Sequence, residues 1–234
     1  MAESGRRTVF VGDVHGCRPE LERLLEQVQF SERDRLVFVG DLVARGPDSL
    51  GVLAIARALD AVVVRGNHEG RVLRELGLGA TFGGSPSRPH QEIAARLGRA
   101  DIDLLAATPL YRTFDDHGLT VVHAGIDPEE PLHLQRPETL LFVRNARTPS
   151  GKKRLWGEVH EGPVAYVFGH NAIEKLQLHP FATGLDTGCV YGGALTALVL
   201  GENEALPRDV AARRAKLVSV PAERVWFDPH SRDD

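Results

Sequence analysis

The stretch LVFVGDLVARGPDS, residues 36–49, decides the fold, because an apolar run of strand length ends there in Gly-Asp. A near copy lies upstream in VFVGDVHG, residues 9–16. A strand made only of apolar residues is typical of a sheet that is covered on both faces. Two such strands ending in the same dipeptide predict that Asp13 and Asp41 lie at one edge of one sheet.

Helical and strand patterns alternate around these two strands. Apolar residues recur at helical spacing within 19–30, with Pro19 in the first turn, and a second helical pattern runs from about 48 to 59. A third apolar strand is predicted over 61–64. The order β-α-β-α-β indicates a parallel sheet with helical crossovers, and therefore the α/β class.

The rest of the chain is predicted to be mostly β, after a helical interruption. A loop rich in glycine and proline covers 77–89, and short helices are predicted near 90–98 and 101–106. We expect one domain over 1–234, with 70–108 as a small helical cap or insertion. The later strands are predicted at 110–114, 119–123, 164–168, 194–200 and 215–220.

Composition is typical of one globular domain of 234 residues, with 42% apolar and 26% charged residues. A formal net charge of −4 gives no strong field for duplex nucleic acid or for a membrane surface. No apolar run is long enough to span a bilayer, and no signal peptide precedes the first strand. We therefore expect a cytoplasmic protein whose two cysteines, Cys17 and Cys189, are reduced packing residues.

Polar side chains with ligand chemistry lie at the ends of five of the predicted strands. Each of them alone has an ordinary structural explanation, as a helix cap, a turn residue or a satisfied buried group. The carboxyl ends of the strands of an α/β sheet meet at one crevice, however, so the set is predicted to gather there. Its members are Asp13, His15, Asp41, Asn67, His68, His123 and His170.

Carboxylate and amide oxygens together with imidazole nitrogens, without cysteine, suit divalent ions such as Mn, Fe, Co or Zn. Asp13 and His15 are two residues apart, face the same way in extended backbone and are predicted to share one ion. The predicted ligands of a second ion are Asn67, His123 and His170. Asp41, with two carboxylate oxygens, is predicted to bridge them. Two ions about 3.5 to 4 Å apart activate water and clamp a phosphoryl group.

The blocks GDVHG, GDLVARGP, GNHE, HAG and GH, in this order across residues 12–170, resemble the phosphoprotein-phosphatase branch of the calcineurin-like metallophosphoesterases. Within that branch, GDLVARGPDSL and LDTGCVYGGALTAL at 185–198 are similar to the symmetrical diadenosine tetraphosphate hydrolases. The resemblance implies a four-layer sandwich of two mixed sheets flanked by helices. It also implies two divalent ions, Mn first among them, held by the six ligands named above.

The resemblance suggests roles for further residues. His68 directly follows ligand Asn67 and is predicted to be the general acid that faces the leaving group. Arg45 resembles the phosphate-clamping arginine of the family, and a guanidinium fork suits two phosphoryl oxygens. Arg144 is a second candidate clamp, with a surface role as the alternative, and Tyr191 is a candidate substrate-binding residue. The basic run 152–154 is interpreted as a distal phosphate site or, more simply, as solvated loop.

Three functions are compatible with these motifs. The first is a hydrolase that cleaves diadenosine tetraphosphate symmetrically to two ADP, with capped RNA 5′ ends as a further substrate. The second, a serine/threonine protein phosphatase of bacterial type, is favoured by Glu69 in GNHE, and the spacing from Gly125 to His170 is shorter than expected of the longer tetraphosphate hydrolases. The third is a nucleotide sensor that only binds. A binder has no need of an acid such as His68 beside six metal ligands, which favours an enzyme.

Ala44 favours the first of these functions. In protein phosphatases of this branch the matching residue is usually a second aspartate, which raises the basicity of the general-acid histidine. A serine alkoxide leaves only with a well-supported proton donor, since the pKa of its alcohol is close to that of water at about 15.7. A nucleotide phosphate has a second pKa of about 6 and departs without a proton. Alanine at position 44 is therefore compatible with anhydride cleavage.

Overall fold

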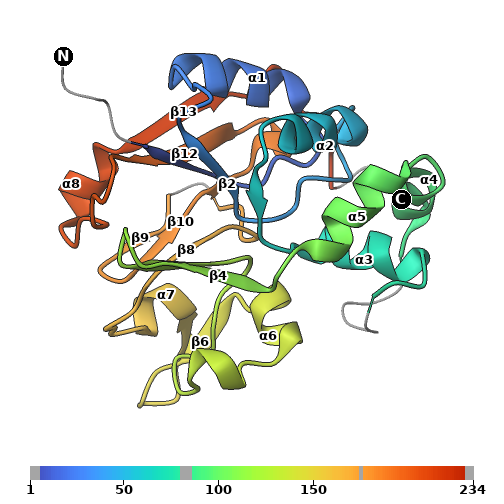
Figure 1. Cartoon of the computed structure of the whole chain (residues 1–234). Coiled ribbons are helices and arrows are strands. Elements are labelled where there is room, and N and C mark those ends of the chain that lie inside the picture. The colour runs from blue at the N-terminus through green and yellow to red at the C-terminus, as the bar shows by residue number, and fades with distance from the viewer. Residues whose placement is uncertain (1–5, 80–85, 174–175, 230–234) are drawn as a thin grey trace.

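Two β-sheets lie between layers of helices in the computed structural model, which describes residues 6–79, 86–173 and 176–229 (Figure 1). The first sheet has the order β11-β12-β1-β2-β3, with β13 paired to β12. Strands β1, β2 and β3 are parallel, and β12 runs antiparallel to β1. Its strands are β1 (Thr8–Val11), β2 (Arg35–Phe38), β3 (Val62–Val63), β11 (Asp186–Thr187), β12 (Ala194–Leu200) and β13 (Leu217–Pro221).

The second sheet has the order β4-β5-β8-β10-β9 and is also mixed. Strands β5, β8 and β10 are parallel, while β4 forms an antiparallel hairpin with β5. A separate two-stranded hairpin is formed by β6 (Asn145–Arg147) and β7 (Lys153–Leu155). The strands of the second sheet are β4 (Tyr111–Phe114), β5 (Leu119–Val122), β8 (Ala165–Phe168), β9 (Leu178–His179) and β10 (Ala182–Gly184).

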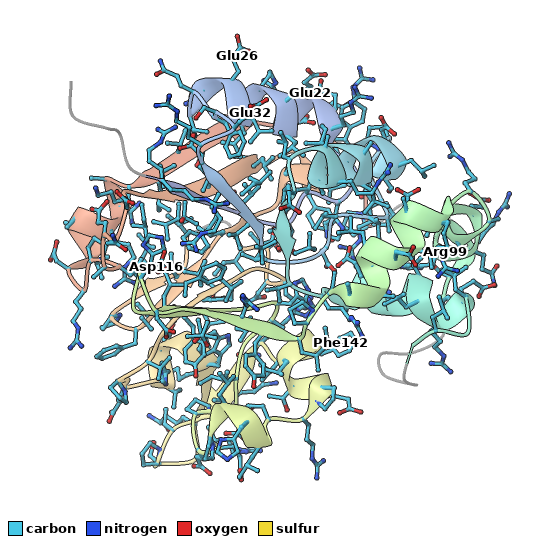
Figure 2. All side chains as sticks on the ribbon, in the orientation of Figure 1. Glu22, Glu26, Glu32, Arg99, Asp116 and Phe142 are labelled. Atoms are coloured by element: carbon cyan, nitrogen blue, oxygen red, sulfur yellow. The ribbon has the colours of Figure 1, made fainter. Side chains whose placement is uncertain are left out.

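Helices cover the outer faces of the two sheets. On α1, Glu22 and Glu26 point into solvent, away from the sheet that the helix covers (Figure 2). The helices are α1 (Arg18–Gln27), α2 (Ser49–Ala58), α3 (Asn67–Glu75), α4 (Arg88–Ala94), α5 (Arg99–Ala107), α6 (Pro137–Phe142), α7 (Trp156–Val159) and α8 (Val210–Arg214). Two 3₁₀ turns cover Leu132–Leu134 and Cys189–Tyr191. No helix in the described ranges combines the length and apolar character that crossing a bilayer requires.

Alternation along the central strands explains the layers. On β1, Val9 and Val11 pack with the helices of the first outer layer, while Phe10 packs between the two sheets. The inter-sheet core also contains Val37 of β2 and Val121 of β5. Both faces of these strands are therefore buried, which is why their sequences are continuously apolar.

Every predicted element forms, but the structure also contains elements that were not predicted, including helices α7 and α8 and strands β6, β7, β9, β10 and β11. The parallel sheet, the helical crossovers and the later strands all form, with boundaries shifted by a few residues. Cys17 and Cys189 are both buried. Helix α3 was not predicted, because its first turn, NHEG at 67–70, reads as a turn after a strand. Part of the predicted 77–89 loop lies outside the described residues, and the assignment of 70–108 as a cap stays a prediction.

Arg213 on α8 joins the C-terminal region to the second sheet. Its guanidinium is fully buried and, among the described residues, is hydrogen-bonded to carbonyl and hydroxyl oxygens with no carboxylate. Burial lowers the pKa of Arg213, yet five acceptors within 3.2 Å compensate for the lost water. The acceptors are the carbonyl oxygens of Pro207, His179, Pro180 and Arg208 and the hydroxyl of Thr183.

We predict that Arg213→Lys lowers the free energy of unfolding by about 2–4 kcal/mol, because an ammonium group has only three donors and cannot reach all the acceptors spread around the edge of the planar guanidinium. Urea denaturation followed by circular dichroism measures the change. The exposed neighbour provides the control, since Arg214→Lys should change stability by less than about 0.5 kcal/mol. Equal effects of the two substitutions would show that the buried hydrogen bonds of Arg213 contribute nothing specific.

Candidate metal and phosphate site

The candidate site lies where both sheets end. Asp13, Asp41 and Asn67 follow β1, β2 and β3 of the first sheet, and His123 and His170 follow β5 and β8 of the second. In every case the polar residue comes within four residues of the end of its strand. The parallel arrangement therefore gathers the six predicted ligands at one edge, as the sequence indicated.

Glycines precede several of these residues because the ligands of neighbouring strands occupy the space of a side chain. A Cβ on Gly66 would overlap the carboxylate oxygen Oδ1 of Asp41. A Cβ on Gly169 would overlap Oδ1 of Asp13 in the same way. The Gly-Asp, Gly-Asn and Gly-His pairs thus reflect close approach between segments from different strands.

One half of the cluster is formed by Asn67, His123 and His170 around Asp41. The Oδ1 atom of Asn67 lies 3.0 Å from His123 Nε2 and 2.9 Å from His170 Nδ1. The Oδ2 atom of Asp41 lies 3.4 Å from the same His123 nitrogen. Ligand atoms of Asp41, His123 and His170 all fall within 4.8 Å of one another.

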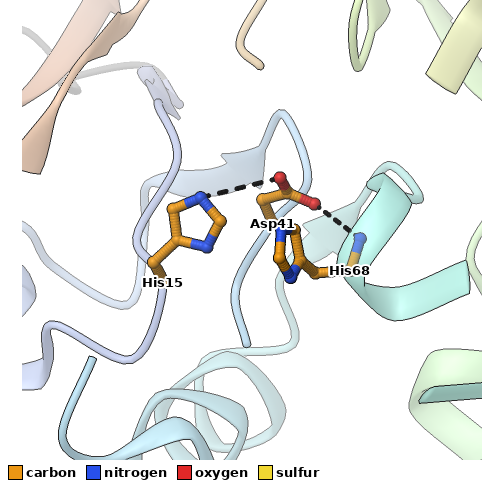
Figure 3. Close-up of side chains that lie close together, drawn as sticks. All are labelled: His15, Asp41 and His68. Carbon is orange, nitrogen blue, oxygen red and sulfur yellow. Dashed lines mark hydrogen bonds and ion pairs between the residues drawn. The ribbon is translucent and has the colours of Figure 1, made fainter. Parts of the chain in front are cut away.

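The other half is formed by His15 and Asp13. His15 Nε2 lies 3.6 Å from Asp41 Oδ2, and Figure 3 shows the two side chains facing each other beside His68. The second oxygen of Asp41 accepts the backbone N–H of His68 at 3.0 Å. Asp13 Oδ2 accepts the backbone N–H of His170, while its Oδ1 is buried without a hydrogen-bond partner in the described chain. Asp41 therefore stands between the two groups.

Hydrogen bonds outside the cluster orient the histidine rings toward it. The Nδ1 atoms of His15 and His123 lie 3.2 and 3.1 Å from the carbonyl oxygens of Val43 and Val39. A carbonyl only accepts, so both Nδ1 atoms carry the proton. In the neutral rings, the Nε2 lone pairs then point inward. Such an outer hydrogen bond is what a metal-ligating histidine makes in proteins.

The electrostatics of the cluster require a cation. Nε2 of His123 faces two oxygens that only accept, those of Asn67 and Asp41. Burial opposes a charged ring, but the Asp41 carboxylate outweighs it and raises the pKa of His123 to about 10. Burial likewise opposes the Asp41 charge, but His123 and His68 hold the pKa of that carboxyl well below its usual range. A divalent ion satisfies the same atoms, so the donor set fits metal binding.

Five non-glycine residues of the site have left-handed backbone. Residues with a Cβ rarely adopt this conformation, and it costs about 1–3 kcal/mol each where the surrounding structure enforces it. They are His15, Asp41, Ala44, Arg45 and His170, with φ of 48°, 51°, 71°, 71° and 66°. The loops after β1, β2 and β8 are thus held in strained conformations that aim the ligands inward.

Glu69 holds the loop after β2 in that conformation. Its two carboxylate oxygens accept the backbone N–H groups of Asp41 and Leu42, each at 2.8 Å, and that of Val43 at 3.3 Å. They also accept the N–H of Gly66 at 2.8 Å. Burial, and then the charge of Asp41, raise the pKa of Glu69 to about 7. One buried carboxylate therefore joins the Asp41 loop to the start of α3.

Arg45 extends over the cluster between two aromatic rings. Its guanidinium carbon lies 5.5 Å from the ring centre of Tyr191 and 5.6 Å from that of Phe227, within cation–π range. Its Nη1 atom donates to His15 Nε2 at 2.9 Å. The predicted phosphate clamp is thus positioned beside the ligands by aromatic packing.

A cavity of about 730 Å³ contains Arg45, Arg144 and Tyr191 in its lining, together with the ligands Asp41, Asn67 and His170. The three predicted substrate-binding residues are therefore brought together. In the basic run 152–154, Lys153 and Arg154 lie on β7 and Lys152 directly precedes it, and the run lines none of the described cavities next to the predicted ligands. All three side chains are exposed, so the alternative of a solvent-exposed role fits that position, although two of the residues are in a strand.

Sequence reasoning did not single out three other residues of the site. Asp186 lines the same cavity, and burial raises its pKa to about 6. Arg71 also lines it and lies four residues after Asn67 on α3, so helical spacing could have identified it once α3 was known. His90 touches His68, and no local pattern connects two residues 22 positions apart.

The family model described as calcineurin-like phosphoesterase matches residues 6–204. The chain is a calcineurin-like phosphoesterase. The family assignment and the α/β sandwich expected from the motifs are therefore confirmed, as is the prediction of a hydrolase. Phosphoesterases of this family use divalent metal ions, in agreement with the histidine and carboxylate cluster.

Relatives of this phosphoesterase carry two related names. It is 33% identical over 261 residues to bis(5′-nucleosyl)-tetraphosphatase, symmetrical, of Erwinia tasmaniensis, with 82% of this chain and 93% of that protein covered. It is 30% identical over 222 residues to bis(5′-nucleosyl)-tetraphosphatase PrpE, asymmetrical, of Halalkalibacterium halodurans, with 83% and 90% covered. A crystal structure of a protein provisionally described as a diadenosine tetraphosphatase matches with a TM-score of 0.78 and 32% identity, covering 94% and 95% of the two chains.

We predict that Glu69→Gln lowers the free energy of unfolding by about 2–4 kcal/mol and reduces Mn²⁺ content, because the amide NH₂ faces backbone N–H groups that then lose their acceptor. Urea denaturation and equilibrium dialysis measure the two changes. Glu75→Gln, at an exposed position on the same helix, is the matched control and should leave both unchanged. Full metal content in Glu69→Gln would show that the loop holds its shape without this carboxylate.

Proposed function

We propose that this phosphoesterase is a metal-dependent hydrolase that cleaves dinucleoside tetraphosphates, with diadenosine tetraphosphate as the representative substrate, symmetrically into two nucleoside diphosphates. The observation that carries the proposal is a pair of cavities of nearly equal size that share lining residues beside the candidate metal cluster. Their volumes are about 730 and 700 Å³. Each lies within the range of cavities that bind a nucleotide-sized ligand.

The two cavities have a common wall of basic and aromatic residues. Arg45, Arg71 and Tyr191 line both of them. The first continues past Phe142 and Ile173, and the second past Trp226 and Phe227. Aromatic rings suit nucleobases, and guanidinium groups suit phosphates. A substrate with a base at each end and a polyphosphate in the middle matches this arrangement.

The N-terminus of α3 adds to the attraction for phosphate. The helix begins at Asn67, beside the common wall, so its positive dipole end lies next to the cluster. Arg45 would bind two phosphoryl oxygens with its planar fork, held in orientation by Tyr191 and Phe227. These groups neutralise the negative charge of the polyphosphate and hold one phosphorus atom at the ligands.

The ligand assignment is part of the proposal. Asp13, His15 and Asp41 would hold one ion, and Asp41, Asn67, His123 and His170 the other, with Mn²⁺ as the first candidate. When bound, the ions would supply an activated water and neutralise charge on the phosphoryl group. His68 faces the second cavity and would donate a hydrogen bond to the leaving oxygen. The leaving nucleotide would then occupy the second cavity and the other half of the substrate the first.

Anhydride cleavage is favoured over phosphoester cleavage by the surroundings of His68. Position 44, which carries a carboxylate in the protein phosphatases that the motifs resemble, is alanine and lines the second cavity. A leaving nucleotide phosphate needs charge neutralisation more than protonation. Near-equal cavities favour symmetrical cleavage, since each would then take one nucleoside diphosphate.

We predict that the manganese form converts diadenosine tetraphosphate to ADP alone, with phosphate release from a phosphoserine peptide slower by more than about 100-fold. Chromatographic identification of the products measures both reactions. ATP plus AMP as products would contradict the symmetrical assignment. Faster release from the peptide would instead favour a protein phosphatase.

We also predict that Asp41→Asn weakens Mn²⁺ binding by more than about 100-fold, and more than Asn67→Asp does, because only position 41 supplies anionic oxygens to both ions. Metal analysis after dialysis against a fixed free Mn²⁺ concentration measures the difference. Asn67→Asp is the matched control, since it replaces an amide by a carboxylate, whereas Asp41→Asn replaces a carboxylate by an amide. A greater loss of metal in Asn67→Asp would show that Asp41 is not the bridge.

A further inference from the structure

The second ring nitrogen of His68 has a partner in the helical segment after α3. His68 Nδ1 lies 2.9 Å from Nε2 of His90, and both side chains are buried. The ring planes are within 24° of each other, with centroids 5.0 Å apart. Nearly parallel planes allow the lone pair of one ring nitrogen to meet the N–H of the other. His68 is therefore hydrogen-bonded to a histidine, where an aspartate would be expected from the protein phosphatases.

The other ring nitrogen of His90 is hydrogen-bonded to Ser87, the residue that precedes α4. His90 Nδ1 lies 3.2 Å from the backbone nitrogen of Ser87 and 2.8 Å from its hydroxyl oxygen. A backbone N–H only donates, so Nδ1 of His90 is an acceptor. Burial, and then the charge of Arg71, lower the pKa of His90 to about 4, so the ring is neutral. Its single proton therefore lies on Nε2.

This arrangement determines where His68 carries its own proton. His90 Nε2–H donates to His68 Nδ1, which must then be an acceptor, so the proton of a neutral His68 lies on Nε2. That Nε2 is buried and has no hydrogen-bond partner in the described part of the chain. The His68 ring lines the second cavity and contacts His15 edge-on, with centroids 4.9 Å apart. An N–H donor is thus presented between the cluster and the second cavity.

We propose that Ser87 and His90 hold His68 as the neutral Nε2–H tautomer, so that His68 donates a hydrogen bond to an anionic leaving group without giving up its proton. The inference rests on the proposed function, since it specifies the leaving groups that the site accepts. Phosphate anhydrides fit, because the nucleotide phosphate departs as an anion. Alkyl phosphoesters do not, because the alkoxide must be protonated. His90 is a positioning residue that acts through His68.

The tautomer also separates His68 from the metal ligands. His68 has a ring nitrogen within 4.8 Å of the ligand atoms of His15 and Asp41, so distance alone would admit it as a ligand. A protonated Nε2 has no lone pair to offer a metal ion, and Nδ1 is occupied by His90. The same hydrogen bonds that make His68 a donor thus keep it out of the coordination shell.

Nitrogen NMR of the full-length protein labelled with ¹⁵N-histidine tests the tautomer directly, without added metal and with diamagnetic Zn²⁺. We expect the His68 signals to show Nε2 protonated and Nδ1 unprotonated in both samples. Ser87→Ala keeps the backbone N–H and should give the same pattern. A proton on His68 Nδ1 in the wild-type protein, or a change of tautomer in Ser87→Ala, would overturn the proposal.

Two substitutions of His90 test the consequence for substrate choice. Glutamine can place an NH₂ donor near the position of Nε2, whereas glutamate offers only acceptor oxygens. We expect His90→Glu to raise the ratio of phosphoserine-peptide turnover to diadenosine tetraphosphate turnover by about tenfold or more, and His90→Gln to change it by less than about threefold. An equal ratio in the two variants would overturn the role of His90.

The NMR result and the product assay separate this inference from the proposed function. An Nε2–H tautomer in a protein that does not cleave dinucleoside tetraphosphates would refute the substrate and leave the hydrogen-bond chain intact. Symmetrical cleavage by a protein with His68 protonated at Nδ1 would support the substrate and refute the chain. The two hypotheses therefore fail in distinguishable ways.

Discussion

The buried carboxylate of Glu69 is the interaction on which the site depends. It accepts backbone N–H groups from the loop that carries Asp41 and from the start of the helix that carries Asn67 and His68. Residues from two neighbouring strand ends are thereby fixed relative to each other by hydrogen bonds within the protein. Asp41 can stand between two sets of ligands only because its backbone is held in this way.

The meeting of two sheets supplies the remaining ligands. Strands β1 to β3 provide carboxylates and an amide, whereas β5 and β8 provide two histidines. Neither sheet alone carries all six predicted ligands, so the inter-sheet core built around residues such as Phe10 and Val121 is also what assembles the candidate site. Stability of that core and geometry of the site are therefore linked through the same strands.

The sequence predicted the parts of this structure that depend on local pattern and strand order. Continuous apolar strands predicted the covered sheet, and the Gly-Asp, Asn-His and Gly-His pairs predicted which side chains would meet. The contact of His90 with His68 could not be predicted from the sequence, because it depends on how α4 packs beside α3 and not on spacing along the chain. The four backbone N–H groups that donate to Glu69 could not be predicted either, because the motif GNHE does not indicate which donors its glutamate accepts.

Left-handed backbone occurs at His15, Asp41, Ala44, Arg45 and His170. For stability engineering, the strand-end loops that contain these residues therefore differ from the outer helices. Changes that relax these loops would gain stability while turning ligands away from the cluster. Outside them, exposed positions on α1 and α8 can be altered for thermal tolerance without touching the geometry of the site. A thermostabilised form of this phosphoesterase is therefore best sought on the outer helices, with the strand-end loops left as they are.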